Sequence, residues 1–97
     1  MAYMARYDFS GKVAVVTGGA QGIGSGIVRK FVDDGMSVVV GDIDCAALDE
    51  ASAVFAASGR WHGIRTDVAC EADVRALLAA AVAQFGRIDA LVNNAGI

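Results

Sequence analysis

Glycines at three fixed positions are the residues of this sequence best suited to binding chemistry. Gly18, Gly22 and Gly24 lie in the segment TGGAQGIG, between a short valine-rich run and an amphipathic segment. Where a strand meets a helix, the first glycine permits a sharp turn, the second lets the backbone approach a pyrophosphate, and the third lets helix and strand pack closely. The N–H groups of the first helical turn then face the phosphate oxygens. This spacing predicts a binding site for the phosphates of a dinucleotide.

A carboxylate follows the glycine loop at a distance that suits the ribose of the same ligand. Asp42 ends the second predicted strand, 18 residues after Gly24, and a carboxylate there accepts hydrogen bonds from the adenosine ribose. The alternative is that Asp42 and Asp44 are ordinary turn residues, but the glycine loop favours the ribose role. A 2′-phosphate would face the Asp42 carboxylate, and Gln21 brings no positive charge to the loop. We therefore expect the cofactor to be NAD rather than NADP.

Short apolar runs alternate with amphipathic segments along the chain. The apolar runs are typical of buried strands, and the amphipathic segments carry apolar residues at helical spacing. We predict strands over 12–17, 37–42, 61–68 and 88–93 and helices over 22–35, 45–58 and 71–85. Right-handed crossovers between parallel strands place helices on both faces of a sheet. The pattern predicts a doubly wound α/β fold of the Rossmann type, with strand order 3-2-1-4, after a loose lead-in over 1–11.

Length and composition narrow the possible functions. The chain has 97 residues, 56% of them hydrophobic, and a net charge of −3 from 8 basic and 11 acidic residues. It is too apolar for intrinsic disorder, its charge disfavours nucleic acid as a partner, and no apolar run approaches the ~18 residues of a membrane span. Two cysteines, Cys45 and Cys70, and the lack of a signal-peptide core favour a cytoplasmic location. His62 has no second ligand at metal spacing, so we expect no metal.

Three motifs, in this order, resemble those of the short-chain dehydrogenase/reductase family over nearly the whole chain. TGGAQGIG resembles the family's TGxxxGxG cofactor motif, Asp67 and Val68 resemble its adenine-contacting pair, and the segment 93–96 is similar to its NNAG motif. The resemblance implies that Ile23 adds a backbone contact beside the pyrophosphate. It also implies that the Asp67 carboxylate accepts a hydrogen bond from the adenine amino group, with Val68 contributing its backbone.

The same resemblance assigns roles to the residues after the last strand. It places Asn94 and Gly96 near the ribose and nicotinamide side of the cofactor, and it implies that Asn93 braces the central strand. The sequence departs from the family pattern at Ala69, where a Ser or Thr helix cap is usual. Cys70 is a poor substitute for such a cap.

The family's catalytic Asn, Ser and Tyr-x-x-x-Lys lie further along the chain than these residues. Neither Tyr3 nor Tyr7 is followed four residues later by Lys, and Lys12 and Lys30 are the only lysines. The resemblance implies hydride transfer between NAD and a small alcohol or carbonyl substrate, by a complete protein that forms a homo-oligomer.

We expect no catalytic residue in the 97 residues and no activity from them alone. We also expect a sheet truncated after its fourth strand, so that 1–97 is the dinucleotide-binding portion of a longer protein. A catalytically silent nucleotide-binding module, or a truncated product, is the alternative. Another doubly wound enzyme, such as a methyltransferase, is disfavoured by the NNAG motif.

Overall fold

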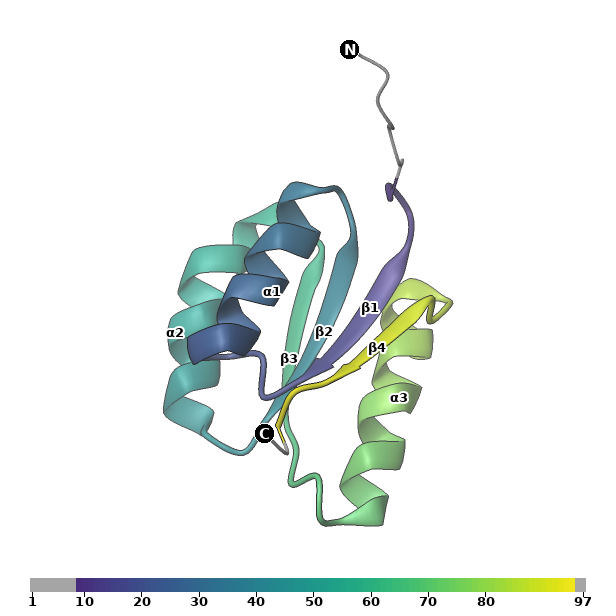
Figure 1. The fold of residues 1–97 in the computed structure, drawn as a ribbon. Helices are drawn as coiled ribbons and strands as arrows, with labels where there is room; N and C mark the ends of the chain where they lie inside the picture. The colour runs from purple at the N-terminus through teal and green to yellow at the C-terminus, as the bar shows by residue number, and fades with distance from the viewer. Residues whose placement is uncertain (1–8, 96–97) are drawn as a thin grey trace.

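The computed structural model describes residues 9–95, which form a four-stranded parallel sheet between two layers of helices (Figure 1). The strands run in the order β3-β2-β1-β4 and are β1 (Val13–Thr17), β2 (Ser37–Asp42), β3 (Trp61–Arg65) and β4 (Ala90–Asn93). Figure 1 shows α1 (Gly22–Asp33) and α2 (Cys45–Phe55) on one face of the sheet and α3 (Glu71–Phe85) on the other. The Rossmann-type fold and the strand order are confirmed. The lead-in predicted over 1–11 lies mostly outside the described residues.

Several predicted elements are shorter in the structure because local hydrogen bonds end them. The helix predicted over 45–58 passes after Phe55 into a 3-10 turn, η1 (Ala56–Ser58), and stops at Gly59, whose φ is 73°. The strand predicted to reach Val68 ends at Arg65, because Asp67 accepts hydrogen bonds from the backbone N–H groups that follow it and so forms a turn. The first helix likewise ends at Asp33 rather than at residue 35.

The core consists of two apolar layers, one on each face of the sheet. Both central strands are buried almost throughout, as predicted for strands covered on two faces. Because side chains alternate along a strand, Val16 and Val40 pack with α1 and α2, whereas Val15 and Val39 pack with Leu77 of α3. The sheet is thereby held from both sides, and its strand ends are fixed relative to one another.

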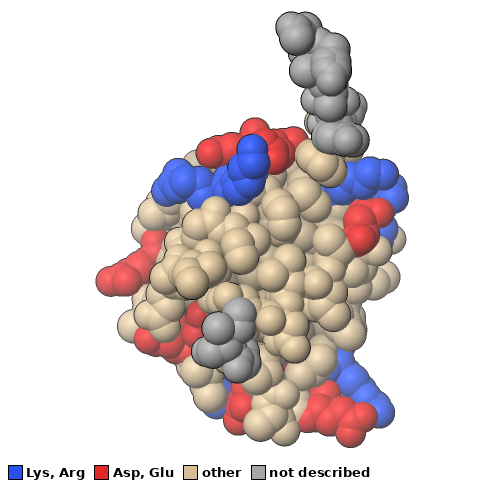
Figure 2. Space-filling view, viewed as in Figure 1, with Lys and Arg blue, Asp and Glu red and all other residues tan. Residues whose placement is uncertain are grey.

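Charged side chains lie mainly around the margin of the face that carries α1 and β4. Figure 2 shows acidic and basic residues interspersed along this margin, with uncharged residues across the middle of the face. Between residues 9 and 95, no helix is both long enough and apolar enough to cross a membrane.

Asp89 joins the beginning of β4 to the beginning of β1. Its backbone N–H donates to the Val13 carbonyl at 2.7 Å, and its Oδ2 accepts from the Val13 N–H at 2.8 Å. The Arg87 guanidinium donates to Oδ1 at 2.7 Å. Two hydrogen bonds hold the pKa of the Asp89 carboxyl below its usual range. The bond from Arg87 has the larger effect, and the bond from the Val13 N–H has the smaller one. The ladder of β4 therefore begins at Ala90, not at residue 88 as predicted.

We expect Asp89→Asn to lower the free energy of unfolding at neutral pH, with a difference from wild type that shrinks in acid. The folded-state pKa is depressed. The stabilisation is therefore complete above the ordinary Asp value of about 3.9 and is lost as the pH falls through the lower folded value. Urea unfolding from neutral pH down to about pH 2 measures this difference.

The matched control is Asp33→Asn, which removes an exposed carboxylate that forms no ion pair within the described part of the chain. It should leave the pH dependence of unfolding close to that of wild type. A constant difference between Asp89→Asn and wild type across the whole pH range would contradict the prediction.

Candidate functional site

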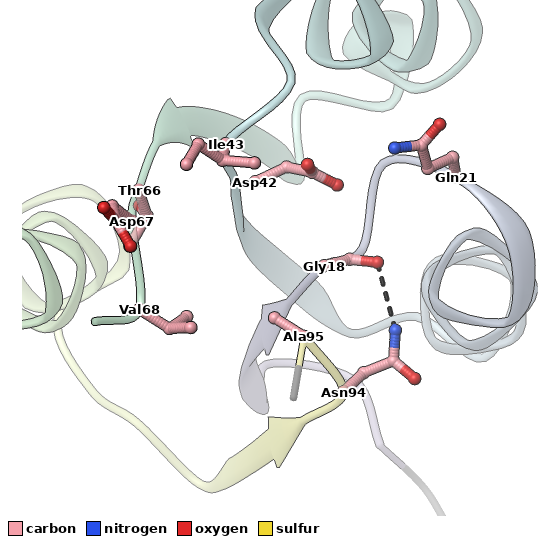
Figure 3. Close-up of a pocket in the computed structure, with 9 residues that line it drawn as sticks. All are labelled: Gly18, Gln21, Asp42, Ile43, Thr66, Asp67, Val68, Asn94 and Ala95. Atoms are coloured by element: carbon pink, nitrogen blue, oxygen red, sulfur yellow. Dashed lines mark hydrogen bonds between the residues drawn. The ribbon is translucent and has the colours of Figure 1, made fainter. Parts of the chain in front are cut away.

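A hollow of about 350 Å³ lies at the carboxyl ends of all four strands. Its walls come from the last residue of β2 and from the segments that follow the four strands (Figure 3): Gly18, Gln21, Asp42, Ile43, Thr66, Asp67, Val68, Asn94 and Ala95. The chain leaves β1 toward β2 on one side, whereas β4 flanks β1 on the other. In open α/β sheets, ligands bind in the crevice at such a switch point.

The structure brings together most, but not all, of the residues predicted to bind a cofactor. Those that line the hollow are Gly18, Gln21, Asp42, Asp67, Val68 and Asn94. Gly22, Ile23 and Gly24 belong instead to the first turn of α1, beside the hollow. Gly96 lies outside the described residues.

Three lining residues were not predicted from the sequence: Ile43, Thr66 and Ala95. Ile43 offered the clearest signal, because an apolar residue directly after a strand-ending carboxylate is unusual in a turn. It is 57% exposed. Ala95 lies in the segment 93–96 that resembles the NNAG motif, whereas Thr66 carries no such signal, since its place in the hollow depends on how the strands are ordered.

The glycine loop has its shape for two physical reasons. Gly18 has a φ of 67° and Gly22 a φ of 60°, a backbone region that side chains with a Cβ disfavour. Gly24 instead allows close approach, because a Cβ there would lie 2.1 Å from the Gly18 carbonyl oxygen. The turn at Gly18 and the close packing at Gly24 are confirmed. At Gly22, an added Cβ would meet no described atom within 4 Å, so the space above it is open.

The first turn of α1 lies beside the hollow and has no side-chain cap from its N-cap residue. The N-cap residue, Gln21, forms no side-chain hydrogen bond to the helix, and the first turn contains no acidic residue. The first N–H groups of a helix have no partner within the helix, and its dipole places partial positive charge there. Within the described residues, this end of α1 therefore carries partial positive charge that Gln21 does not cap.

Asp42 connects the glycine loop to the end of β2. Its side chain is buried, and Oδ2 accepts from the Ala20 N–H at 3.2 Å while Oδ1 accepts from the Asp44 N–H at 3.0 Å. A carboxylate has about four acceptor positions. Two therefore remain for donors of a ligand, at the edge of the hollow shown in Figure 3.

The Thr17 hydroxyl connects the end of β1 to the segment after β4. It accepts from the N–H groups of Asn94 and Ala95 at 3.1 and 3.2 Å, and donates to Asn93 Oδ1 at 3.1 Å. The Asn94 side-chain amide donates to the Gly18 carbonyl at 3.1 Å (Figure 3). Asn93 thus braces the central strand, as the family resemblance implies. Thr17 was missed as a site residue, although a hydroxyl at the end of a valine strand is a recognisable signal.

A second carboxylate, Asp67, lies beyond the end of β3. Its Oδ1 accepts from the Ala69 N–H at 2.9 Å, and its own N–H donates to Asp73 Oδ2 at 3.0 Å. The Thr66 N–H donates to the Asp42 carbonyl at 3.0 Å, which ties the turn after β3 to the turn after β2. The two carboxylates therefore have a fixed relative placement.

The arrangement offers both hydrogen-bonding groups and apolar surface to a ligand. Carboxylates and backbone N–H groups provide acceptors and donors, and the partly exposed Ile43 and Val68 provide apolar surface on the β2 and β3 sides of the hollow (Figure 3). Within the described part of the chain, the residues that line the hollow include no lysine, histidine, cysteine or tyrosine. Among residues 9–95, no group of three His, Cys, Asp or Glu side chains is placed to hold a metal ion.

Comparison with known proteins identifies a family and several relatives of this chain. Residues 12–97 match the short chain dehydrogenase family. L-fucose dehydrogenase of Oryctolagus cuniculus is 52% identical over 101 residues, which cover 99% of this chain and 32% of that protein. Cis-4-hydroxycyclohexanecarboxylate dehydrogenase of Sinomonas cyclohexanicum is 47% identical over 89 residues, which cover 92% of this chain and 36% of that protein.

Solved structures of similar proteins share this fold. A short chain dehydrogenase/reductase from Burkholderia phymatum, in complex with NAD, superposes with a TM-score of 0.83 and 39% identity. The match covers 89% of this chain and 31% of that one. The chain therefore spans about a third of the length of the relatives it matches. With a family match over most of its residues and relatives this similar, the chain belongs to the short-chain dehydrogenase family, a family of oxidoreductases.

Proposed function

We propose that this chain forms the NAD-binding part of an oxidoreductase that transfers hydride between nicotinamide and a small alcohol or carbonyl substrate. The observation that carries the proposal is the hollow at the four strand ends. It combines an uncapped helix N-terminus with two carboxylates that retain free acceptor positions. The complex of the Burkholderia relative with NAD supports the choice of a dinucleotide.

The residues fit the phosphate part of such a cofactor. The loop from Gly18 to Gly24 turns at two positive-φ glycines, and the space above Gly22 is open. N–H groups of the first turn of α1 donate to the pyrophosphate oxygens, with Ile23 contributing its backbone. No lysine or arginine is needed, because the helix terminus itself supplies partial positive charge.

The residues also fit the adenosine part. Asp42 accepts from the ribose hydroxyls with the acceptor positions that Ala20 and Asp44 leave free. Asp67 accepts from the adenine amino group, while Val68 and Ile43 contact the base from the β3 and β2 sides. We place Asn94 and Gly96 beside the nicotinamide half.

The remaining steps of the reaction need residues that these 97 do not include. A bound NAD accepts or supplies the hydride, and this chain orients it. The sequence contains no Tyr-x-x-x-Lys pair to exchange the substrate proton, so we expect the 97 residues to catalyse no hydride transfer by themselves. We place the complete protein in the cytoplasm as a homo-oligomer, and the unpaired cysteines Cys45 and Cys70 fit a reducing compartment.

We expect the protein to bind NAD at least about tenfold more tightly than NADP. A 2′-phosphate near Asp42 would place like charges ~4 Å apart, which costs about 1 kcal/mol in water and about 4 at an effective dielectric of 20. Asp42→Asn removes that repulsion and should lower the ratio of NAD affinity to NADP affinity by about tenfold. Calorimetric titration with the two dinucleotides measures the ratio.

The matched control for this test is Asp44→Asn. It removes a carboxylate two residues away, and because Asn is an equally good helix N-cap, it can keep the bond that Asp44 accepts from Ala47. Its preference for NAD should stay within about twofold of wild type. Equal or tighter binding of NADP by the wild-type protein would refute the role given to Asp42.

We expect Gly22→Val to abolish binding of NAD while the fold is retained. The valine side chain would fill the open space above the loop, where the pyrophosphate is proposed to lie. The substitution also strains a backbone with φ of 60°, at a cost of about 1–2 kcal/mol. Titration with NAD, together with circular dichroism, measures both effects.

Gly59→Val is the control for backbone strain. Gly59 has a φ of 73° and open space around it, but it lies before β3, at the opposite end of the sheet from the hollow. It should lose similar stability and keep full affinity for NAD. Unchanged affinity in a folded Gly22→Val variant would contradict the phosphate role of the loop.

A further inference from the structure

We propose that Asp73, in the first turn of α3, is a positioning residue that sets the preference of the site for adenine by orienting Asp67. The inference rests on the proposed function, because it presupposes that Asp67 accepts a hydrogen bond from the base. Asp73 does not line the hollow. Its effect on the ligand is therefore exerted through Asp67.

The start of α3 has an unusual pattern of hydrogen bonds. Its N-cap residue, Cys70, forms no side-chain bond to the helix. In a usual capping box, the third helical residue accepts from the N–H of the cap residue. Here the Cys70 N–H donates instead to the Asp67 carbonyl at 2.9 Å. Asp73, the third residue of α3, accepts from the Asp67 N–H at 3.0 Å.

These bonds fix Asp67 on three sides. Its N–H is held by Asp73, its carbonyl accepts from Cys70, and its Oδ1 accepts from the Ala69 N–H at 2.9 Å. Within residues 9–95, its Oδ2 receives no hydrogen bond from another group. One oxygen of a rotationally restricted carboxylate is therefore left for a ligand, on a residue that lines the hollow together with Val68.

A carboxylate oxygen held in this way distinguishes two purines. Adenine carries an amino group at C6, which donates to a carboxylate. Hypoxanthine carries a carbonyl oxygen at the same place, which the carboxylate repels. The discrimination depends on orientation, because a freely turning side chain could move away from the carbonyl. Asp73 therefore controls the ratio of the two affinities, mainly through the affinity for the adenine dinucleotide.

The ion pair of Asp73 with Arg65 contributes less than its bond to Asp67. The Arg65 guanidinium lies 3.4 Å from Asp73 Oδ2, and the two side chains are 54% and 30% exposed. Exposed pairs of this kind add little free energy. The hydrogen bond to the Asp67 N–H is thus the contact whose loss should matter.

The test compares binding of NAD with binding of nicotinamide hypoxanthine dinucleotide, both by calorimetric titration. For Asp73→Ala we expect the preference for NAD to fall about tenfold, as for the loss of a hydrogen bond to a charged group. Affinity for the hypoxanthine dinucleotide should change by no more than about twofold. Asp73→Asn should restore most of the preference, because its amide oxygen can still accept from the Asp67 N–H.

Glu71→Ala is the matched control. It removes the other carboxylate of the same helical turn, whose partner is Arg75 at 2.7 Å and not Asp67. It therefore matches the change in helix-terminal charge and should leave the ratio of affinities as in wild type. Thermal unfolding of both variants shows whether stability is affected equally.

A double-substitution cycle separates positioning from a direct contact. In an Asp67→Ala background, which has already lost the preference for adenine, adding Asp73→Ala should change the ratio no further. The inference is overturned if Asp73→Ala leaves the ratio unchanged, or if Glu71→Ala lowers it equally. Failure of the wild-type protein to bind either dinucleotide would instead overturn the proposed function, and this inference with it.

Discussion

The double pairing of the central strand is the constraint on which the rest of the structure depends. β1 is hydrogen-bonded to β2 along one edge and to β4 along the other, and all five of its residues are buried. A strand enclosed in this way can change direction only beyond its end. The turn at Gly18 therefore falls where β1 emerges from the sheet. The loops after β2 and β4 emerge beside it, because the register of the two ladders places Gly41 and Asn93 opposite Thr17.

Groups at this edge of the sheet serve both the fold and the site. The Thr17 hydroxyl holds the segment after β4, the Asp42 carboxylate holds the glycine loop, and the Asp67 carboxylate holds its own turn. The Thr17 hydroxyl already uses its donor and both of its acceptor positions within the protein, whereas each of the two carboxylates has acceptor positions left. Carboxylates are suited to such double use, since they have more acceptor positions than one backbone contact requires. A site built in this way needs little rearrangement to receive a ligand, so the entropic cost of ordering side chains on binding is small.

The groups that line the described hollow are acceptors, N–H donors and apolar surface. The chain spans about a third of the length of its relatives. Two of these relatives are L-fucose dehydrogenase and cis-4-hydroxycyclohexanecarboxylate dehydrogenase. In oxidoreductases that use a nicotinamide cofactor, the cofactor carries the hydride chemistry and the protein binds and orients it.

The sequence by itself determined the fold class and the two strongest elements of the site. Alternating valine runs and amphipathic segments predict the buried strands and their helices, since these patterns depend only on local periodicity. The glycine spacing predicts the loop because φ and the absence of a Cβ are properties of single residues. Asp42 could be located because it ends a strand whose position is evident from its valines. These inferences needed no knowledge of contacts between distant residues.

Tertiary structure alone decided how the remaining residues meet. Thr17 contacts Asn94 and Ala95, which are 77 and 78 residues away along the chain. Ile43 and Val68 belong to the same hollow only because β2 and β3 are neighbours in the sheet. Asp73 reaches back past the start of its helix to the Asp67 N–H, because the Cys70 N–H, its usual donor, is bonded to the Asp67 carbonyl. Such contacts depend on strand order, register and the competition between nearby hydrogen-bonding groups, none of which leaves a periodic signal in the sequence.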